Sequence, residues 1–349
     1  MESPLEVLTA LVRIPSPSGK EEAAVEYVRG LLEAAGHRAT VAGRNVCAER
    51  GSGGPLLLLN SHLDTVPATA AWTRDPFGGT VEEGRFYGLG AGDAKSAVAG
   101  LLFAFLHAPL PRRGRLLFAA TCDEETGGEG MEKLVGSLPR PDAALVGEPT
   151  AMQVCSAQKG LVKLEVVARG RAGHASRPWE GVNAIERAAE DVLAVQGLEF
   201  PEEDPLLGRA TLAVTMIAGG VRSNVIPPEC RVTVDGRSTP DWPNERLVDA
   251  VRHAASGEVV VKSARFQPVH TAAGAAIVRA ALNALDLVSP RAFGGVSDLF
   301  HLRRCPGIIV GPGAPEQSHQ ADEHIAIADF LRGVEGYRRI VEAYFEEEA

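Results

Sequence analysis

The chain has 349 residues, enough for two domains with a substantial core. Its net charge is −10 and it contains no block of Lys or Arg, which argues against a nucleic-acid partner and against binding to an anionic membrane. The five cysteines are odd in number, scattered and never spaced C-x-x-C, which argues against a disulfide framework and against a thiolate zinc site.

The N-terminal segment "MESPLEVLTALVRIPSPSG" is acidic early and has no basic stretch followed by an apolar core, so we expect no signal peptide. The longest apolar run, residues 97–106, is too short to span a bilayer and fits a buried helix. Together with cysteines that suit a reducing compartment, these features predict a cytoplasmic protein.

Helices and apolar strands alternate in the first part of the chain. Capping boxes at Ser3–Glu6 and Ser18–Glu21 predict two helices, and Gly36 predicts the end of the second. We then expect a strand at 55–60, a small hairpin at 80–88, a buried helix at 96–108, a strand at 115–122, a helix near 129–136 and a strand at 143–147. Continuous apolar strands that alternate with helices are typical of a mostly parallel sheet with helices on both faces.

The pattern changes after Lys159, where residues 161–170 alternate apolar and polar as a half-exposed antiparallel strand does. A helix at 183–196, strands at 211–218 and 230–237, a helix at 244–255 and a strand at 258–266 complete a two-layer α/β sandwich. Residues 275–285 and 307–313 again have the apolar patterns of a buried helix and a buried strand, and a last helix is expected at 327–346. We therefore predict an α/β protein whose first domain, residues 1–159 and 268–349, is interrupted by an inserted domain, residues 160–267.

Histidines and carboxylates follow the apolar strands, at the edge where open parallel sheets bind ligands. His62 and Asp64 follow the strand at 55–60, and Asp93 lies where the buried helix begins; Asp123, Glu124 and Glu125 follow the strand at 115–122, Glu148 follows 143–147, and His319 follows 307–313. Clustered carboxylates repel one another unless a cation lies among them. Imidazoles and carboxylates without thiolate suit zinc, cobalt or manganese, and their number suits two ions that share one carboxylate.

Each residue alone has a simpler explanation. His62 and Asp64 could lie on a surface turn, Asp93 could cap a helix, and His319 could be solvated. Alternatively, Asp64 could orient the imidazole of His62. The adjacent glutamates are more informative, because neighbouring side chains point apart and are poorly suited to binding one ion together. One suits a metal ligand, and the other suits a carrier of the proton of the attacking water.

In this order, the motifs "SHLDTVP", "GLGAGDAK", "DEETGG", "GEPT", "GHASRP", "GPG" and "SHQADE" resemble the M20 metallopeptidase and aminoacylase family over nearly the whole chain. The resemblance implies one metal bound by His62, Asp93 and Glu148 and a second bound by Asp93, Glu125 and His319. It also implies Glu124 as the general base, Asp64 as the residue that orients His62, and a cis peptide bond between Asp93 and Ala94. We expect two divalent ions, with zinc preferred over cobalt or manganese.

The inserted domain resembles the lid or dimerisation domain of that family, which implies a homodimer formed through this domain. The resemblance implies that His174 stabilises the oxyanion, often in the active site of the partner subunit. It implies that Asn224 and Arg237 bind the carboxylate of the substrate, and that Gly295 and Ser297 belong to a loop that contacts the substrate. Arg is suited to this task because its guanidinium forms paired hydrogen bonds with a carboxylate.

The implied reaction is metal-dependent removal of an acyl group, preferably acetyl, from a small N-acyl amino acid. The motifs are most similar to those of enzymes that act on N-acetylornithine or N-acetylcitrulline, which would place the chain in arginine biosynthesis. A desuccinylase, a deacylase of carrier-linked lysine and a di- or carboxypeptidase stay open within the family. From other classes, a non-catalytic metal-bearing binding protein is disfavoured because Glu124 is present, and a dinucleotide-dependent oxidoreductase because "GLGAGD" lacks a third glycine.

Overall fold

The computed structural model describes residues 2–348, and contacts divide the chain into two compact units. The first takes the residues up to Ser156, then Thr271–Phe293, then the residues from Ser297 onward. The second takes Ala157–His270 and Gly294–Val296. No helix within residues 2–348 is both long and apolar enough to cross a bilayer.

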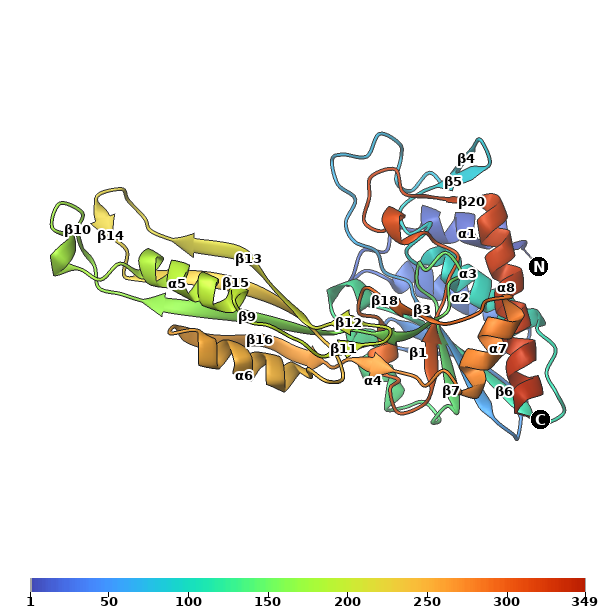
Figure 1. Ribbon diagram of the computed structural model, residues 1–349. Helices are drawn as coiled ribbons and strands as arrows, with labels where there is room; N and C mark the ends of the chain where they lie inside the picture. The colour runs from blue at the N-terminus through green and yellow to red at the C-terminus, as the bar shows by residue number, and fades with distance from the viewer. Residues whose placement is uncertain (1, 349) are drawn as a thin grey trace. The chain divides into compact units, whose positions relative to one another are not determined.

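The first unit holds six α-helices and most of the strands of a nine-stranded sheet (Figure 1). The helices are α1 (Pro4–Arg13), α2 (Glu22–Ala34), α3 (Lys95–His107), α4 (Glu129–Val135), α7 (Ala276–Ala284) and α8 (Ile327–Glu347). The strands of this sheet are β1 (Ala39–Ala42), β2 (Asn45–Ser52), β3 (Leu56–His62), β6 (Gly114–Thr121), β7 (Ala143–Val146), β8 (Cys155–Gln158), β17 (Val269–His270), β18 (Arg291–Phe293) and β19 (Gly307–Ile309). A smaller sheet contains β4 (Thr80–Glu82), β5 (Arg85–Tyr87) and β20 (His324–Ala326).

The large sheet has the order β1-β2-β6-β3-β7-β19-β8-β17, and its four central strands, β6, β3, β7 and β19, run parallel. Antiparallel pairs flank them on both sides. Every residue of β3 is buried, so both faces of the sheet are covered at its centre. The predicted α/β fold with a mostly parallel sheet is therefore confirmed.

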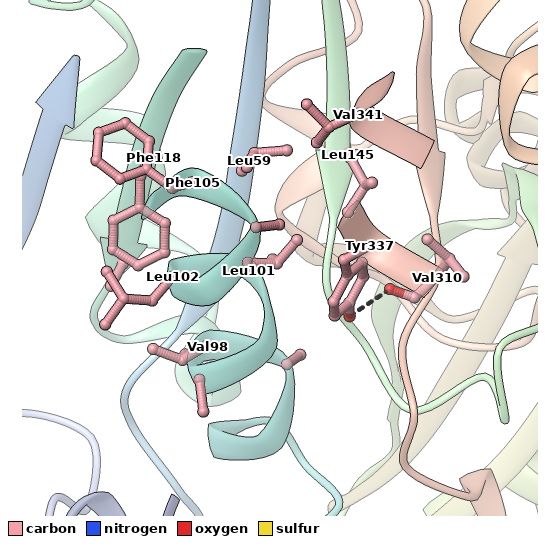
Figure 2. Packing of buried hydrophobic residues seen from close by; sticks show 14 of the residues in the cluster. Leu59, Val98, Leu101, Leu102, Phe105, Phe118, Leu145, Val310, Tyr337 and Val341 are labelled. Carbon is pink, nitrogen blue, oxygen red and sulfur yellow. Dashed lines mark hydrogen bonds between the residues drawn. The ribbon is translucent and has the colours of Figure 1, made fainter. Parts of the chain in front are cut away.

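The core of the first unit packs around α3, whose residues are almost all buried (Figure 2). Phe105 of α3 contacts Phe118 of β6, with ring centroids 5.9 Å apart. Tyr337 of α8 donates a hydrogen bond to the carbonyl of Val310 at 2.8 Å. A Cβ at Gly100 would lie 2.8 Å from the ring of Tyr337, so this glycine lets α8 approach α3 closely.

The second unit is built on a four-stranded antiparallel sheet of order β13-β15-β9-β16 (Figure 1). Its long strands are β9 (Gly160–Arg169), β13 (Thr211–Gly219), β15 (Glu229–Ser238) and β16 (Glu258–Phe266). Its helices are α5 (Ala184–Gln196) and α6 (Asn244–Ala254), and its short strands are β10 (Gly173–His174), β11 (Glu203–Asp204), β12 (Gly208–Arg209) and β14 (Val225–Ile226). Side chains of the sheet and of both helices form one apolar core, as a two-layer sandwich requires. The boundaries at residues 159/160 and 267/268 stay a prediction.

One expectation about local structure is wrong, and two strands were not foreseen. The capping box at Ser3–Glu6 is present, but Ser18 caps no helix: α2 begins at Glu22, and the Ser18 hydroxyl donates to Asp64 Oδ2 at 2.7 Å. Glu21, the other half of the expected box, is fully buried and binds an arginine instead. Strands β1 and β2 were not predicted: β1 has only four residues, and the second half of β2 is polar and largely exposed.

Candidate metal centre

The predicted ligands lie at the carboxyl ends of neighbouring parallel strands. His62 is the last residue of β3, and the acids at 123–125 follow β6, which pairs with β3. Glu148 follows β7 on the other side of β3. Asp93 lies two residues before the start of α3, and the peptide bond between Asp93 and Ala94 is cis, as expected. Parallel pairing thus delivers ligands from distant parts of the chain to one edge.

Asp93 lies between the two histidines. Its Oδ1 is 3.3 Å from Nε2 of His62, and its Oδ2 is 3.7 Å from Nε2 of His319. Each oxygen of this carboxylate therefore faces a different imidazole, which is the arrangement that a carboxylate shared by two metal ions requires.

Glu125 and Glu148 also lie beside the two histidines. Oε2 of Glu125 lies 2.9 Å from Nε2 of His319, and Oε2 of Glu148 lies 3.9 Å from Nε2 of His62. Ligand atoms of His62, Glu124 and Glu148 lie within 4.8 Å of one another, as do those of His62, Asp93 and Glu125. The second oxygen of Glu148 is buried and has no hydrogen-bond partner among residues 2–348, so the donor set fits a divalent cation.

The carboxylates hinder one another's ionisation. Burial, followed by the charge of Glu148, raises the pKa of Glu124 well above its usual value. Burial also raises the pKa of Glu148, although His62 opposes the shift. A divalent cation among these groups would favour their charged forms, including the ionised Glu124 that a general base needs.

Asp64 contacts the acidic loop as well as His62. Its Oδ1 and Oδ2 accept hydrogen bonds from the backbone N–H groups of Glu124 and Glu125, at 3.0 and 3.1 Å. Nδ1 of His62 lies 3.0 Å from the carbonyl oxygen of Asp64 and 3.5 Å from its Oδ1. Burial alone would lower the pKa of His62, but hydrogen bonds to Asp64 and Asp93 outweigh it and raise this pKa. Asp64 therefore orients the two glutamates at least as directly as it orients His62.

Asp123, the first of the three adjacent acids, forms an ion pair with Arg44. Arg44 lies between Glu21 and Asp123: its Nε is 2.5 Å from Glu21 Oε2, and its Nη2 contacts Asp123 Oδ2. Glu21 also accepts the backbone N–H of Asp123 at 3.2 Å. Glu21, Cys122 and Asp123 are close enough to hold a cation, but the guanidinium already supplies the positive charge.

Two buried acids near the centre were not singled out from the sequence. Asp298 accepts a hydrogen bond from the Thr121 hydroxyl at 2.7 Å, and burial raises its pKa to about 6. Glu323 accepts backbone N–H groups of the loop that carries Asp93. The sequence signal for Glu323 is its place in "SHQADE", four residues after His319.

The predicted substrate residues of the second unit lie at two ends of its sheet. His174 pairs with Val225 between β10 and β14, and the carbonyl of Asn224 accepts the N–H of Ala175 at 3.0 Å. Arg237 lies at the other end of the sheet, on β15, where it pairs with Leu161 of β9. The eight residue steps from Glu229 to Arg237 span roughly 26 Å of extended strand. Within the second unit, Asn224 and Arg237 therefore cannot contact one amino-acid carboxylate together.

The side chains of His174, Arg237 and Ser297 already form hydrogen bonds within the chain. Nδ1 of His174 contacts Ser176 twice: it lies 2.7 Å from the hydroxyl oxygen and 3.2 Å from the backbone nitrogen, which donates to it. Arg237 Nε donates to Asp235 Oδ1 at 2.7 Å, so its guanidinium forms an intrachain ion pair. The Ser297 hydroxyl accepts the N–H of Leu299 at 3.3 Å and caps a short 3-10 helix, while Gly295 lies in the preceding bend.

Comparison with known proteins agrees with this geometry. Residues 58–343 match the sequence profile of Peptidase family M20/M25/M40. The chain belongs to the M20 peptidase family. It is 34% identical over 358 residues to an acetylornithine deacetylase of Myxococcus xanthus, covering 93% of each chain. It is 31% identical over 377 residues to a succinyl-diaminopimelate desuccinylase of Rhodospirillum centenum, covering 98% of this chain and 97% of the relative.

The fold of this M20 protein is shared with solved structures. A metallo-carboxypeptidase of the M20 family from Sulfolobus solfataricus aligns over 99% of this chain and 100% of its own, with a TM-score of 0.81 at 19% identity. The family and the residues at the strand ends identify this M20 protein as a metallohydrolase, consistent with a dinuclear metal-dependent amidohydrolase.

Proposed function

We propose that this M20 enzyme removes an acyl group, preferably acetyl, from a small N-acyl amino acid such as N-acetylornithine or N-acetylcitrulline. The observation that carries the hydrolytic part is the position of Asp93, with one oxygen toward His62 and the other toward His319. The similarity to an acetylornithine deacetylase supports the choice of acyl group and amino acid. A desuccinylase or a carboxypeptidase would use the same centre and is distinguished by its substrate.

The proposed ligands form two sets that share Asp93: His62 and Glu148 on one side, Glu125 and His319 on the other. Two divalent ions, with zinc preferred, would polarise the acyl carbonyl and lower the pKa of a water molecule. Glu124 takes the proton of the attacking water as the water oxygen adds to the acyl carbon. It then passes that proton to the amine nitrogen as the C–N bond breaks, which leaves the free amino acid and a carboxylic acid that loses its own proton to solvent.

We propose that His174 donates a hydrogen bond to the developing oxyanion through Nε2. The two contacts of Ser176 with Nδ1 support this role, because they engage that nitrogen and orient the ring, so that Nε2 is the nitrogen offered to the oxyanion. Arg237 would bind the amino-acid carboxylate with N–H groups beyond the one that donates to Asp235, since a guanidinium has five.

We propose a homodimer formed through the second unit. The separation of Asn224 from Arg237 supports it, because one substrate can contact both only if they come from two chains. The edge strand β13 also carries exposed apolar side chains at Met216 and Ile217, and such an edge favours pairing with another chain. Exposed Trp179, Leu193 and Val221 add apolar surface in the same unit.

The test is metal-dependent turnover of N-acetylornithine. Enzyme stripped with a chelator should be inactive, and two equivalents of zinc or cobalt should restore hydrolysis. Full activity in stripped enzyme with no measurable metal would contradict the proposal.

A further inference from the structure

Glu323 is a buried glutamate whose carboxylate binds backbone amides of a single loop. Its Oε2 accepts the N–H of Gly90 at 2.8 Å, and its Oε1 accepts the N–H groups of Gly92 at 2.6 Å and Asp93 at 2.9 Å. The residue is 1% exposed. A buried carboxylate with three such partners is strongly constrained, and so is the loop that it binds.

The loop that Glu323 binds ends at Asp93, the proposed shared ligand. Residues 88–94 form turns rather than a regular element, so their conformation depends on contacts of this kind. A Cβ at Gly92 would lie 3.3 Å from Glu323 Oε1, which shows how closely the carboxylate approaches the backbone. The carbonyl of Glu323 also accepts the N–H of Gly88 at 3.0 Å.

Glu323 also lies four residues after His319, the proposed ligand on the far side of Asp93. The segment from His319 to Glu323 therefore carries one ligand and holds the backbone of another. The Glu323 carboxylate accepts the backbone N–H of Asp93 itself. A shift of Glu323 would therefore displace the Asp93 carboxylate relative to both histidines.

We propose that Glu323 is a positioning residue that fixes the Asp93 carboxylate between His62 and His319. This role rests on the proposed function, in which Asp93 is shared by two metal ions. Residues that orient metal ligands through hydrogen bonds typically change metal affinity by about 10- to 100-fold when they are replaced. In Glu323→Gln, an amide NH2 replaces one acceptor oxygen, so at least one of the three N–H groups loses its partner.

The experiment is calorimetric titration of zinc into chelator-stripped full-length protein, together with the visible absorption spectrum of the cobalt-loaded protein. Asp322→Asn is the matched control, because Asp322 is the adjacent acid but accepts the N–H groups of Thr73 and Arg74, in a segment without a proposed ligand. Asp93→Asn tests the metal centre itself.

We expect Glu323→Gln to weaken zinc binding about 10- to 100-fold and to change the cobalt spectrum, while Asp322→Asn leaves both unchanged. Wild-type affinity and spectrum in Glu323→Gln, with weakened binding in Asp93→Asn, would overturn the role of Glu323 and leave the proposed function standing. Wild-type metal binding in Asp93→Asn would instead overturn the metal centre, and with it the role of Glu323.

Glu323→Asp covers the case in which Glu323→Gln does not fold. It keeps the charge but shortens the side chain by one methylene, so its carboxylate cannot reach all three N–H groups as well. Weaker zinc binding and an altered cobalt spectrum in folded Glu323→Asp would support the role, and wild-type values of both would overturn it.

Discussion

The backbone N–H of Glu124 donates a hydrogen bond to Oδ1 of Asp64 at 3.0 Å. The two residues are 60 positions apart in the sequence. The contact ties the segment after β3 to the segment after β6, so the position of the proposed base depends on an acid from a neighbouring strand. Asp64 holds Glu125 in the same way through its other oxygen.

Replacing Asp64 by Asn should lower kcat and metal affinity together, each by about 10- to 100-fold. The amide keeps one acceptor oxygen but presents an NH2 group to the second of two backbone N–H donors. Steady-state kinetics and zinc titration measure the two effects. Asp75→Asn is the control, because exposed Asp75 also accepts a backbone N–H, that of Phe77, on the surface. Unchanged kcat and zinc affinity in Asp64→Asn would show that the hydrogen bonds of Asp64 do not position the two glutamates for catalysis or metal binding.

Glu124→Gln should retain two metal ions and lose turnover by about 100- to 10,000-fold, because a neutral amide cannot accept the proton of water. Metal analysis should therefore show an unchanged metal content, while steady-state kinetics show a lower kcat. Glu129→Gln is the control, since exposed Glu129 pairs with Lys133. Near-normal kcat in Glu124→Gln would mean that another group is the base.

The sequence indicated that these histidines and acids lie near one another, because parallel strands bring their carboxyl ends together, wherever their residues lie in the chain. Hydrogen bonds to loop backbones were harder to foresee. Ser18 has the spacing of a helix cap but binds Asp64, and Glu323 looks like a solvated acid beside His324 but is buried. Such contacts depend on how loops from distant segments fold against one another, and no local periodicity records them.

The predicted substrate residues of the second unit stay a prediction, but the structure adds a condition that the motif did not reveal. Asn224 and Arg237 share one motif, "SNVIPPECRVTVDGRSTP", and were expected to bind one carboxylate. A strand of this length places them far apart, because each extended residue adds about 3.3 Å.

Met216→Glu should convert the proposed dimer to monomers, because it places a charge on the exposed edge strand β13, where Met216 is 65% exposed. Light scattering coupled to gel filtration measures the mass. Val288→Glu, at a 98% exposed valine of the first unit, should leave the mass unchanged. A wild-type protein that is monomeric at micromolar concentration would contradict the dimer.

His174→Ala and Glu124→Gln chains, each inactive, should regain activity when mixed if His174 acts in the active site of a partner subunit. In a mixed dimer, one site would combine an intact Glu124 with the partner subunit's His174. Activity measured after mixing and subunit exchange tests this. No recovery despite demonstrated exchange would place His174 in the site of its own chain or outside the reaction.

The cysteines should be slow to react with thiol reagents at pH 8. All five are free thiols, and burial raises the pKa of Cys155 and of Cys305 to about 11. A thiol of that pKa is about 0.1% ionised at pH 8, and the thiolate is the reactive form. Colorimetric titration should show slow labelling of native protein that accelerates as pH rises, and five reactive thiols after denaturation. Rapid labelling of buried Cys155 or half-buried Cys305 in native protein would contradict this prediction.

The central claim is metal-dependent deacylation of a small N-acyl amino acid. Its most direct test is kcat/KM of zinc- and cobalt-reloaded enzyme on N-acetylornithine, N-acetylcitrulline, N-acetylmethionine, N-succinyl-diaminopimelate and a simple dipeptide. The account predicts metal-dependent cleavage with the highest kcat/KM for N-acetylornithine or N-acetylcitrulline. A clear preference for the dipeptide or the succinyl substrate, with two metals bound, would contradict it.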